Sequence, residues 1–266
     1  GWLMEIGYGN GRLDMIKRAI ESLGGYGGKL DAINTQMTAL LQALESGNMS
    51  DKEAMAEIAK KIKELELNSG VIKSKETMEY VDLGLPSKIM WAKCDLGATS
   101  PEKYGDEYSW GETWTKINYD YYYFTDIVEG QYTKYDSRDK RFFLEKEDDV
   151  AYLRLGEGWR YPTWNEMQEL IDNCTVTEST LNGWPGVMFV SKINNNYIFF
   201  GYRPKGPTAA LRWTSAVVES NPTLAKCLSF ERNYETNKID VSRYDNERKY
   251  RIPVRPVYVK RGAIVK

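Results

Sequence analysis

The sequence contains no histidine among its 266 residues. This absence excludes histidine-based acid–base catalysis, a Ser-His-Asp triad and histidine-ligated zinc. Cysteine is scarce too: Cys94, Cys174 and Cys227 lie far apart, without the short spacings of a metal site. Three such thiols form at most one disulfide, and we predict neither a cofactor nor a metal.

The chain also lacks an excess of charge of either sign. Its 36 basic residues nearly balance its 38 acidic residues, so no net field recruits nucleic acid or an anionic membrane. No run of about 18 apolar residues occurs, so no membrane-spanning helix is predicted. The N-terminus lacks the basic-then-apolar layout of a signal peptide. Aromatic residues, by contrast, are plentiful: 19 Tyr and 8 Trp are typical of recognition surfaces or β-rich cores.

Residues 1–78 are predicted to form a helical region. Between 16 and 44, apolar residues recur at alternating steps of four and three, which is a heptad seam. Asn34 occupies a seam position, where a polar residue can fix coiled-coil register. A second amphipathic helix begins at Ser50, which forms a capping box with Glu53. The narrow seams favour a self-associating stalk, for which we expect a homotrimer; the alternative is an intramolecular helical hairpin.

The sequence pattern of residues 79–259 predicts a compact α+β domain of short strands with one or two helices, followed by a tail at 260–266. A short helix is expected at Ser100-Pro101, and 114–149 reads as a long loop or insertion. Further helical stretches are expected over 148–155 and from Thr163, whose capping box with Glu166 marks the N-terminus of a helix. Asn194-Asn195-Asn196 suits the turn of a hairpin.

The last third of the chain, from Leu211 to Tyr258, has the most distinctive composition. Apolar pairs mark short strands at Leu228 and Phe230, at Ile239 and Val241, and at Val254 and Val257. The polar stretch 231–250 around the second pair, rich in Tyr, Asn, Arg and Asp, is interpreted as a long loop. Such side chains offer contact area and adaptable hydrogen bonds at low entropy cost, which indicates a binding face. The alternative is a solvated loop on a β-domain.

Several blocks of the sequence resemble one known family. In chain order they are Tyr-Val-Asp-Leu-Gly-Leu-Pro-Ser (80–87), Trp-Ala-Lys-Cys-Asp-Leu-Gly-Ala-Thr-Ser-Pro-Glu (91–102), Tyr-Gly-Asp (104–106), Trp-Gly-Glu-Thr (110–113), Gly-Trp-Arg-Tyr-Pro-Thr-Trp-Asn-Glu-Met (158–167), Phe-Phe-Gly-Tyr-Arg (199–203), Arg-Trp-Thr-Ser (212–215) and Val-Arg-Pro-Val (254–257). Together they resemble the C-type-lectin-like "major paralogous" domain, which includes variable proteins diversified by retroelements. The resemblance covers roughly residues 79–259 and leaves the helical N-terminus outside.

The resemblance implies a C-type-lectin-like fold of the formylglycine-generating-enzyme branch, with variable residues near the C-terminus. Trp213, Ser215 and Arg255 match scaffold positions of this family, and Thr214 replaces the usual middle Ser of the Trp-Ser-Ser block. The sequence departs from the family where Arg251-Ile252-Pro253 stands in place of a Gly followed by an aromatic-Ser pair.

The resemblance implies a non-enzymatic ligand- or receptor-binding protein, such as a phage tail-fibre tip or a bacterial surface adhesin. Its partner would be a protein or glycan receptor on a cell surface, and its location extracellular, cell-surface or virion.

The alternatives are a formylglycine-generating-like enzyme, for which only Cys227 lies in the C-terminal region, and a calcium-dependent lectin, whose usual sugar-site motifs are absent. A framework role in the core is expected for Cys227. The expected ligand-binding residues are Arg212, Thr214, Glu219, Asn221, Arg232, Asn233, Tyr234, Glu235, Arg243, Tyr244, Asp245, Asn246, Lys249 and Tyr250.

Overall fold

A computed structural model describes residues 76–113, 127–128, 131–132, 134–204 and 210–260. By its contacts the chain divides into two units, one of residues 1–74 with 117–133 and one of residues 75–116 with 134–266. In the first unit, the described residues form a hairpin of β4 (Ile127–Val128) and β5 (Gln131–Tyr132). The predicted stalk helices, their Asn34, the trimer that they imply and tail residues 261–266 lie outside the described residues.

The second unit, called the head below, is rich in strands with few helices, as the α+β prediction states. Its helical segments are η2 (Lys146–Asp148), α4 (Val150–Leu155) and α5 (Trp164–Asn173). Its strands are β1 (Tyr80–Val81), β2 (Met90–Ala92), β3 (Glu107–Tyr108), β6 (Trp159–Arg160), β7 (Cys174–Leu181), β8 (Trp184–Ser191), β9 (Tyr197–Gly201), β10 (Ala210–Val218), β11 (Asn221–Asn233), β12 (Lys238–Glu247), β13 (Ile252–Pro253) and β14 (Val257–Tyr258).

Three sheets and one strand pair build the head. The first sheet has the order β1-β2-β14-β6, so strands from both ends of the unit lie in one sheet. Trp91 of β2 pairs with Val81 on one side and with Val257 on the other. The second and third sheets are the meanders β7-β8-β9 and β10-β11-β12, and β13 pairs with β3.

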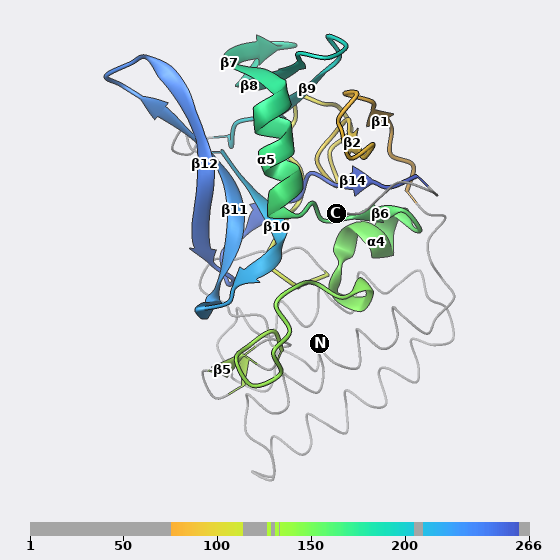
Figure 1. Cartoon of the computed structure of the whole chain (residues 1–266), viewed down its shortest axis with the longest axis vertical. Coiled ribbons are helices and arrows are strands. Elements are labelled where there is room, and N and C mark those ends of the chain that lie inside the picture. The colour runs from red at the N-terminus through yellow and green to blue at the C-terminus, as the bar shows by residue number, and fades with distance from the viewer. Residues whose placement is uncertain (1–75, 114–126, 129–130, 133, 205–209, 261–266) are drawn as a thin grey trace, which may run out of the picture. The chain divides into compact units, whose positions relative to one another are not determined.

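Helix α5 packs between the two meanders (Figure 1). Its Met167 and Leu170 belong to one buried apolar cluster with Phe189 of β8, Phe200 of β9 and Phe230 of β11. A second buried cluster contains Trp213 and Cys227 and lies against β3, β13 and α4. Trp213 and Cys227 are directly opposite in the β10–β11 pair and share one face, whereas Leu228, the next residue of β11, belongs to the first cluster on the other face. This sheet therefore has core on both faces at that level.

Local sequence accounts for the start of α5 and for its neighbouring hairpin. The Thr163 hydroxyl accepts the Glu166 N–H at 3.2 Å, and Glu166 Oε2 accepts the Thr163 N–H at 2.8 Å. This is the predicted capping box, and it is confirmed. The predicted β8–β9 hairpin is confirmed as well, with Asn195 in the left-handed region at φ 62°.

Two predictions of local structure are wrong. Ser100-Pro101 starts a single turn, closed by Lys103 N–H bonding to Ser100 O at 3.2 Å, and not a helix. The stretch 231–250 is not a long loop, because β11 extends to Asn233 and β12 runs from Lys238 to Glu247; only the strand predicted at Ile239 and Val241 is confirmed there. Alternating half-buried side chains of β12 explain why it forms a strand: Ile239 and Val241 pack on the core, with polar residues between them.

Candidate functional site

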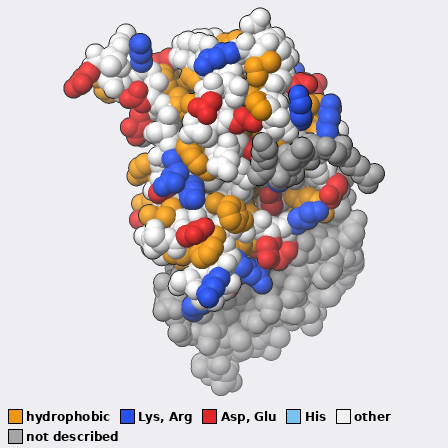
Figure 2. Space-filling view, viewed as in Figure 1, with side chains coloured by type: hydrophobic (Ala, Val, Ile, Leu, Met, Phe, Trp, Pro, Cys, Tyr) orange, Lys and Arg blue, Asp and Glu red, His pale blue; other side chains and the backbone are white. Residues whose placement is uncertain are grey.

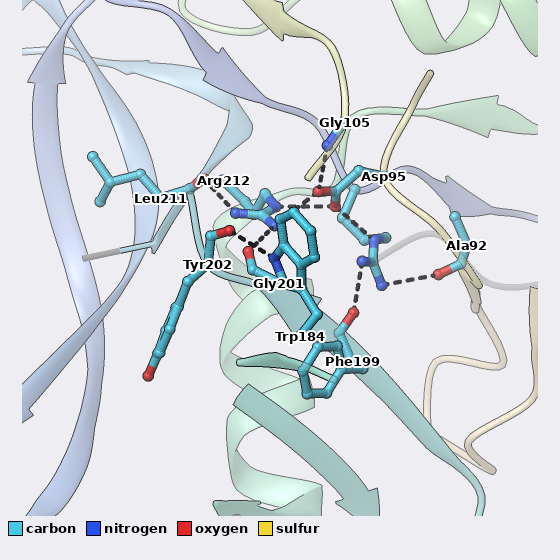
Figure 3. A network of polar contacts seen from close by, with 10 residues as sticks. Ala92, Asp95, Gly105, Trp184, Phe199, Gly201, Tyr202, Leu211 and Arg212 are labelled. Atoms are coloured by element: carbon cyan, nitrogen blue, oxygen red, sulfur yellow. Dashed lines mark hydrogen bonds and ion pairs between the residues drawn. The ribbon is translucent and has the colours of Figure 1, made fainter. Parts of the chain in front are cut away.

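The C-terminal sheet is anchored in the core by a buried Arg-Asp-Arg group. Arg212 of β10 donates from Nε to Asp95 Oδ1 at 3.0 Å and from Nη2 to Asp95 Oδ2 at 2.8 Å (Figure 3). Arg255, next to β14, donates from Nε to the same Oδ1 at 2.9 Å. All three side chains have no exposed surface. The group therefore ties β10 and the C-terminal segment to the loop after β2.

The remaining donors of the two guanidinium groups are satisfied by the backbone of neighbouring strands. Arg212 Nη2 donates to Gly201 O at 3.1 Å, and Arg255 Nη2 donates to Phe199 O at 2.7 Å. Both guanidinium groups also lie over the Phe200 ring, with Cζ at 5.5 and 4.5 Å from its centroid. These contacts make the group a rigid junction of four chain segments.

Burial disfavours the charged form of Asp95, but the charges and hydrogen bonds of Arg212 and Arg255 outweigh this cost. The pKa of Asp95 therefore lies below its ordinary value. With one carboxylate between two guanidinium groups the arrangement is an internal ion cluster, and it offers no exposed group to a ligand.

Two of the predicted contact residues are consequently misplaced. Arg212 belongs to the buried junction, and Thr214 is fully buried with its hydroxyl donating to Lys226 O at 2.8 Å. We correct both predictions: these side chains hold β10 in place and do not face solvent. Trp213 and Arg255, matched to scaffold positions, are also fully buried, and Trp213 Nε1 donates to Tyr108 O at 2.7 Å.

The other predicted contact residues lie along the β11–β12 hairpin and at its base. Because β11 has 13 residues, its ends are about 40 Å apart, and the predicted residues do not form one compact patch. They fall into three groups: Glu219, Asn221, Lys249 and Tyr250 at the base; Arg243, Tyr244, Asp245 and Asn246 in the middle; Arg232, Asn233, Tyr234 and Glu235 at the tip.

The tip of this hairpin projects from the head and carries charged side chains beside apolar ones (Figures 1 and 2). Asn233 organises it: its Oδ1 accepts the N–H groups of Glu235 and Thr236 at 3.0 and 3.1 Å, and its Nδ2 donates to Asp240 at 3.0 Å. This Asx turn holds Tyr234 outward with 81% of its surface exposed.

The middle of β12 presents different chemistry on its two faces. Arg243 lies opposite Leu228, on the face that carries the Phe230 cluster, and pairs with Asp245 at 3.0 Å between Nε and Oδ1. Tyr244 lies opposite Cys227 on the other face and is 49% exposed. The pairing register therefore puts an ion pair on one side of the strand and an aromatic ring on the other.

The expected contact residues did not include Glu231, Asp240 and Ser242, which are exposed in the same hairpin. Glu231 lies opposite Asp240, and Ser242 shares the face of Tyr244 two residues away. The period-two alternation of apolar and polar residues from Ile239 onward was the signal that could have identified Asp240 and Ser242.

The thiols do not resemble reactive cysteines. Cys94, Cys174 and Cys227 are free and buried. Burial raises the pKa of all three, for Cys174 to about 11 and for Cys227 well above its ordinary value. Within the described ranges no cluster of three or more Cys, Asp or Glu side chains is arranged to hold a metal ion. Among those same residues no helix is both long and apolar enough to cross a membrane.

Comparison of the chain with family models, with curated proteins and with solved structures finds no match in any of the three.

Proposed function

We propose that the head is a non-enzymatic ligand-binding module with a C-type-lectin-like fold, and that it binds through the β11–β12 hairpin. The observation that carries the proposal is the hairpin itself. It exposes Tyr234 and Tyr244 among charged side chains, while β10 beside it is anchored by the buried Arg212–Asp95 pair. Rigidly held aromatic side chains next to adaptable polar groups are what a binding surface needs.

The separation of anchor from surface supports this proposal. Framework side chains such as Trp213 and Arg255 are fully buried, so changes at exposed hairpin positions leave the core contacts intact. A scaffold of this kind accepts varied surface residues, which fits the sequence resemblance to retroelement-diversified proteins. A non-enzymatic role also fits the thiols, because cysteine chemistry uses an accessible thiolate, and burial keeps Cys227 protonated.

In this proposal the partner is a protein or glycan receptor on a cell surface. The helical N-terminal region would be the stalk of a homotrimer that presents the head at the tip of a phage tail fibre or on a bacterial adhesin. The protein would then be extracellular, at the cell surface or on a virion. A reverse-transcriptase gene beside this one, with an imperfect repeat of codons 211–257, would support diversification.

A binding survey tests the proposal. Labelled full-length chain is incubated with a panel of bacterial cells and an array of immobilised glycans, beside a Tyr234→Ala/Tyr244→Ala variant. A Tyr197→Ala variant serves as control, because Tyr197 of β9 is 46% exposed but lies on the other meander. We expect the double variant to lose the strongest signals and the control to keep them. Equal loss in both variants, or no loss in the double variant, would contradict the proposed face.

A further inference from the structure

The outer edge of β12 carries backbone hydrogen-bonding groups, which the proposed ligand binding by side chains does not use. In the described part of the chain, β12 is the last strand of the β10-β11-β12 sheet and pairs with β11 along its whole length. A strand bonded on one side leaves alternate N–H and C=O groups of the other side without a sheet partner. In the described residues no strand pairs with the outer side of β12, although β7 also contacts β12. Asp240, Ser242, Arg243 and Tyr244 are exposed in its middle.

We propose that this edge binds a second copy of the chain, whose β12 pairs with it antiparallel about a two-fold axis at Tyr244. Such an axis places Tyr244 opposite Tyr244 of the second copy. Each residue before Tyr244 then lies opposite the residue that follows Tyr244 by the same number of positions in the second copy. Residues 241 to 247 then overlap between the copies. The resulting sheet would run β10-β11-β12 and continue through β12-β11-β10 of the second copy.

Charge complementarity selects this register. With the axis at Tyr244, Arg243 lies opposite Asp245 of the second copy, and Asp245 lies opposite Arg243 of the second copy. Directly opposite residues share a face and interact, so two ion pairs form across the axis. On the other face two Tyr244 rings meet, flanked by Ser242 opposite Asn246, and this face carries no charge within the overlap.

Other axes along β12 are less favourable. An axis at Arg243 sets two guanidinium groups opposite each other, and an axis at Asp240 or Asp245 does the same with two carboxylates. An axis at Asn246 sets Asp245 opposite Glu247. Two positions, Val241 and Ser242, bring no opposite charges together.

One further axis, at Ile239, pairs Lys238 with Asp240 but overlaps only residues 238 to 240 of the strand. Tyr244 is therefore the centre that combines a long overlap with opposite charges and no like-charged pair. Repulsion between like charges makes shifted registers unfavourable, and it also disfavours unspecific pairing at the open edge.

Arg243 and Asp245 already lie where they can exchange their ion pair within one chain for ion pairs with the second copy. In the single chain Arg243 and Asp245 form an ion pair, with Nε 3.0 Å from Oδ1 and with Nη2 donating to Oδ2 at 3.1 Å. They project from the same face of β12, two residues apart. Each can turn to the opposite charge of the second copy without changing face, and no charge is left unpaired in either state.

Pairing of copies uses side chains that also belong to the proposed ligand face, so a ligand on Tyr244 and Arg243 and a second copy exclude each other. The self-pairing itself does not depend on the existence of a ligand. A strand pair is smaller than a standard protein interface, so we expect a weak association that is best detected by trapping.

Cysteine trapping tests the axis in the full chain. Tyr244→Cys places two thiols directly opposite each other, within the range in which a disulfide closes, and the natural thiols are buried. Tyr234→Cys is the matched control, because Tyr234 lies in the same hairpin and is more exposed. Under mild oxidation at micromolar concentration, we expect the Tyr244→Cys chain to form disulfide dimers about tenfold faster than the control, since pairing raises the effective thiol concentration. Equal rates would overturn the proposal.

Exchanging the charges tests the register. On the Tyr244→Cys background, Arg243→Asp sets two carboxylates opposite each other, and Asp245→Arg sets two guanidinium groups opposite each other, so each variant alone should trap slowly. An equimolar mixture of the two restores opposite charges across the axis, and we expect it to trap mixed dimers at the parent rate. Loss of an ion pair within one chain cannot produce this recovery. Trapping by either single variant at the parent rate, or a mixture no faster than its components, would overturn the register.

Discussion

Arg212 and Asp95 form a two-pronged ion pair, with bonds of 3.0 and 2.8 Å, in which both side chains are fully buried. The residues are far apart in the sequence, and the pair joins the loop after β2 to β10. Its position next to Gly201 and Phe200 places it at the meeting of two sheets. The orientation of the C-terminal hairpin relative to the rest of the head therefore depends on this pair.

We predict that Arg212→Ala costs about 3–5 kcal/mol in the free energy of unfolding, because it leaves a buried carboxylate with half of its hydrogen bonds. Arg243→Ala is the control. Its ion pair with Asp245 is partly exposed, with 42% and 26% of the two side chains accessible, and removal of a pair near the surface changes stability by about 0–1 kcal/mol. Urea denaturation followed by tryptophan fluorescence measures both. Similar losses in the two variants would show that the buried pair is not an anchor.

The depressed pKa of Asp95 predicts the direction of a pH effect. The folded protein binds this proton less readily than the unfolded chain, whose Asp pKa is about 3.9. The stabilisation by the ionised group is therefore complete above that value and is lost as the pH falls through the folded pKa. Asp95→Asn should be much less stable than the parent at pH 7, and the gap between them should narrow from pH 5 to pH 3. Urea midpoints across this range give the answer; a gap that widens on acidification would contradict the assignment.

Local signals in the sequence identified much of the head. Side-chain chemistry within a few residues defines the Thr163 capping box and the turn at Asn195, so both were predictable from sequence alone. The helix expected at Ser100 failed because Pro101 and Ser100 also suit a single turn, and the following segment bends back: Gly105 N–H bonds to Asp95 at 3.2 Å. A tertiary contact of this kind overrides local propensity.

The contact residues were harder to assign, for a definite physical reason. Sequence distinguishes polar from apolar side chains but not exposed polar groups from buried, paired ones. The sequence does not distinguish Arg212 from an arginine on the surface, because its partner Asp95 is remote in the chain. Thr214 likewise has its hydrogen-bond acceptor on β11. Tyr234 and Tyr244 are exposed, as expected from their polar sequence neighbours, and their role as contact residues stays a prediction.

Thiol reactivity should follow burial. Cys227 is fully buried and its pKa is well above the ordinary value, whereas Cys94 is the least buried of the three. In the folded protein at pH 8 we expect slow reaction with a disulfide reagent, Cys94 first and Cys227 last, and rapid reaction of all three on addition of denaturant. Cys227→Ala should cost about 1–2 kcal/mol of stability and leave cell or glycan binding unchanged. A thiol that reacts at the rate of a free peptide cysteine in the folded state would argue for cysteine chemistry.

The two exposed tyrosines of the hairpin should contribute unequally to the affinity for a cognate ligand. Tyr244 lies in the middle of β12, held by the register with Cys227 and already half-buried, whereas Tyr234 lies at the tip with 81% of its surface exposed. Central, preorganised aromatic residues are the usual energetic centres of interfaces, while peripheral residues contribute less. We expect Tyr244→Ala to weaken binding by about 2 kcal/mol or more and Tyr234→Ala by about 1 kcal/mol or less.

Both variants should keep the parent melting temperature, because neither ring belongs to the two buried clusters. Trp213→Ala should instead lower the melting temperature, because it removes a fully buried indole and its bond to Tyr108 O. Titration of each purified variant against the strongest binder from the cell and glycan survey, with melting curves in parallel, separates the two effects. A Tyr234→Ala loss larger than that of Tyr244→Ala would move the centre of the binding surface to the hairpin tip, and a loss confined to Tyr197→Ala would move it to the β7-β8-β9 sheet.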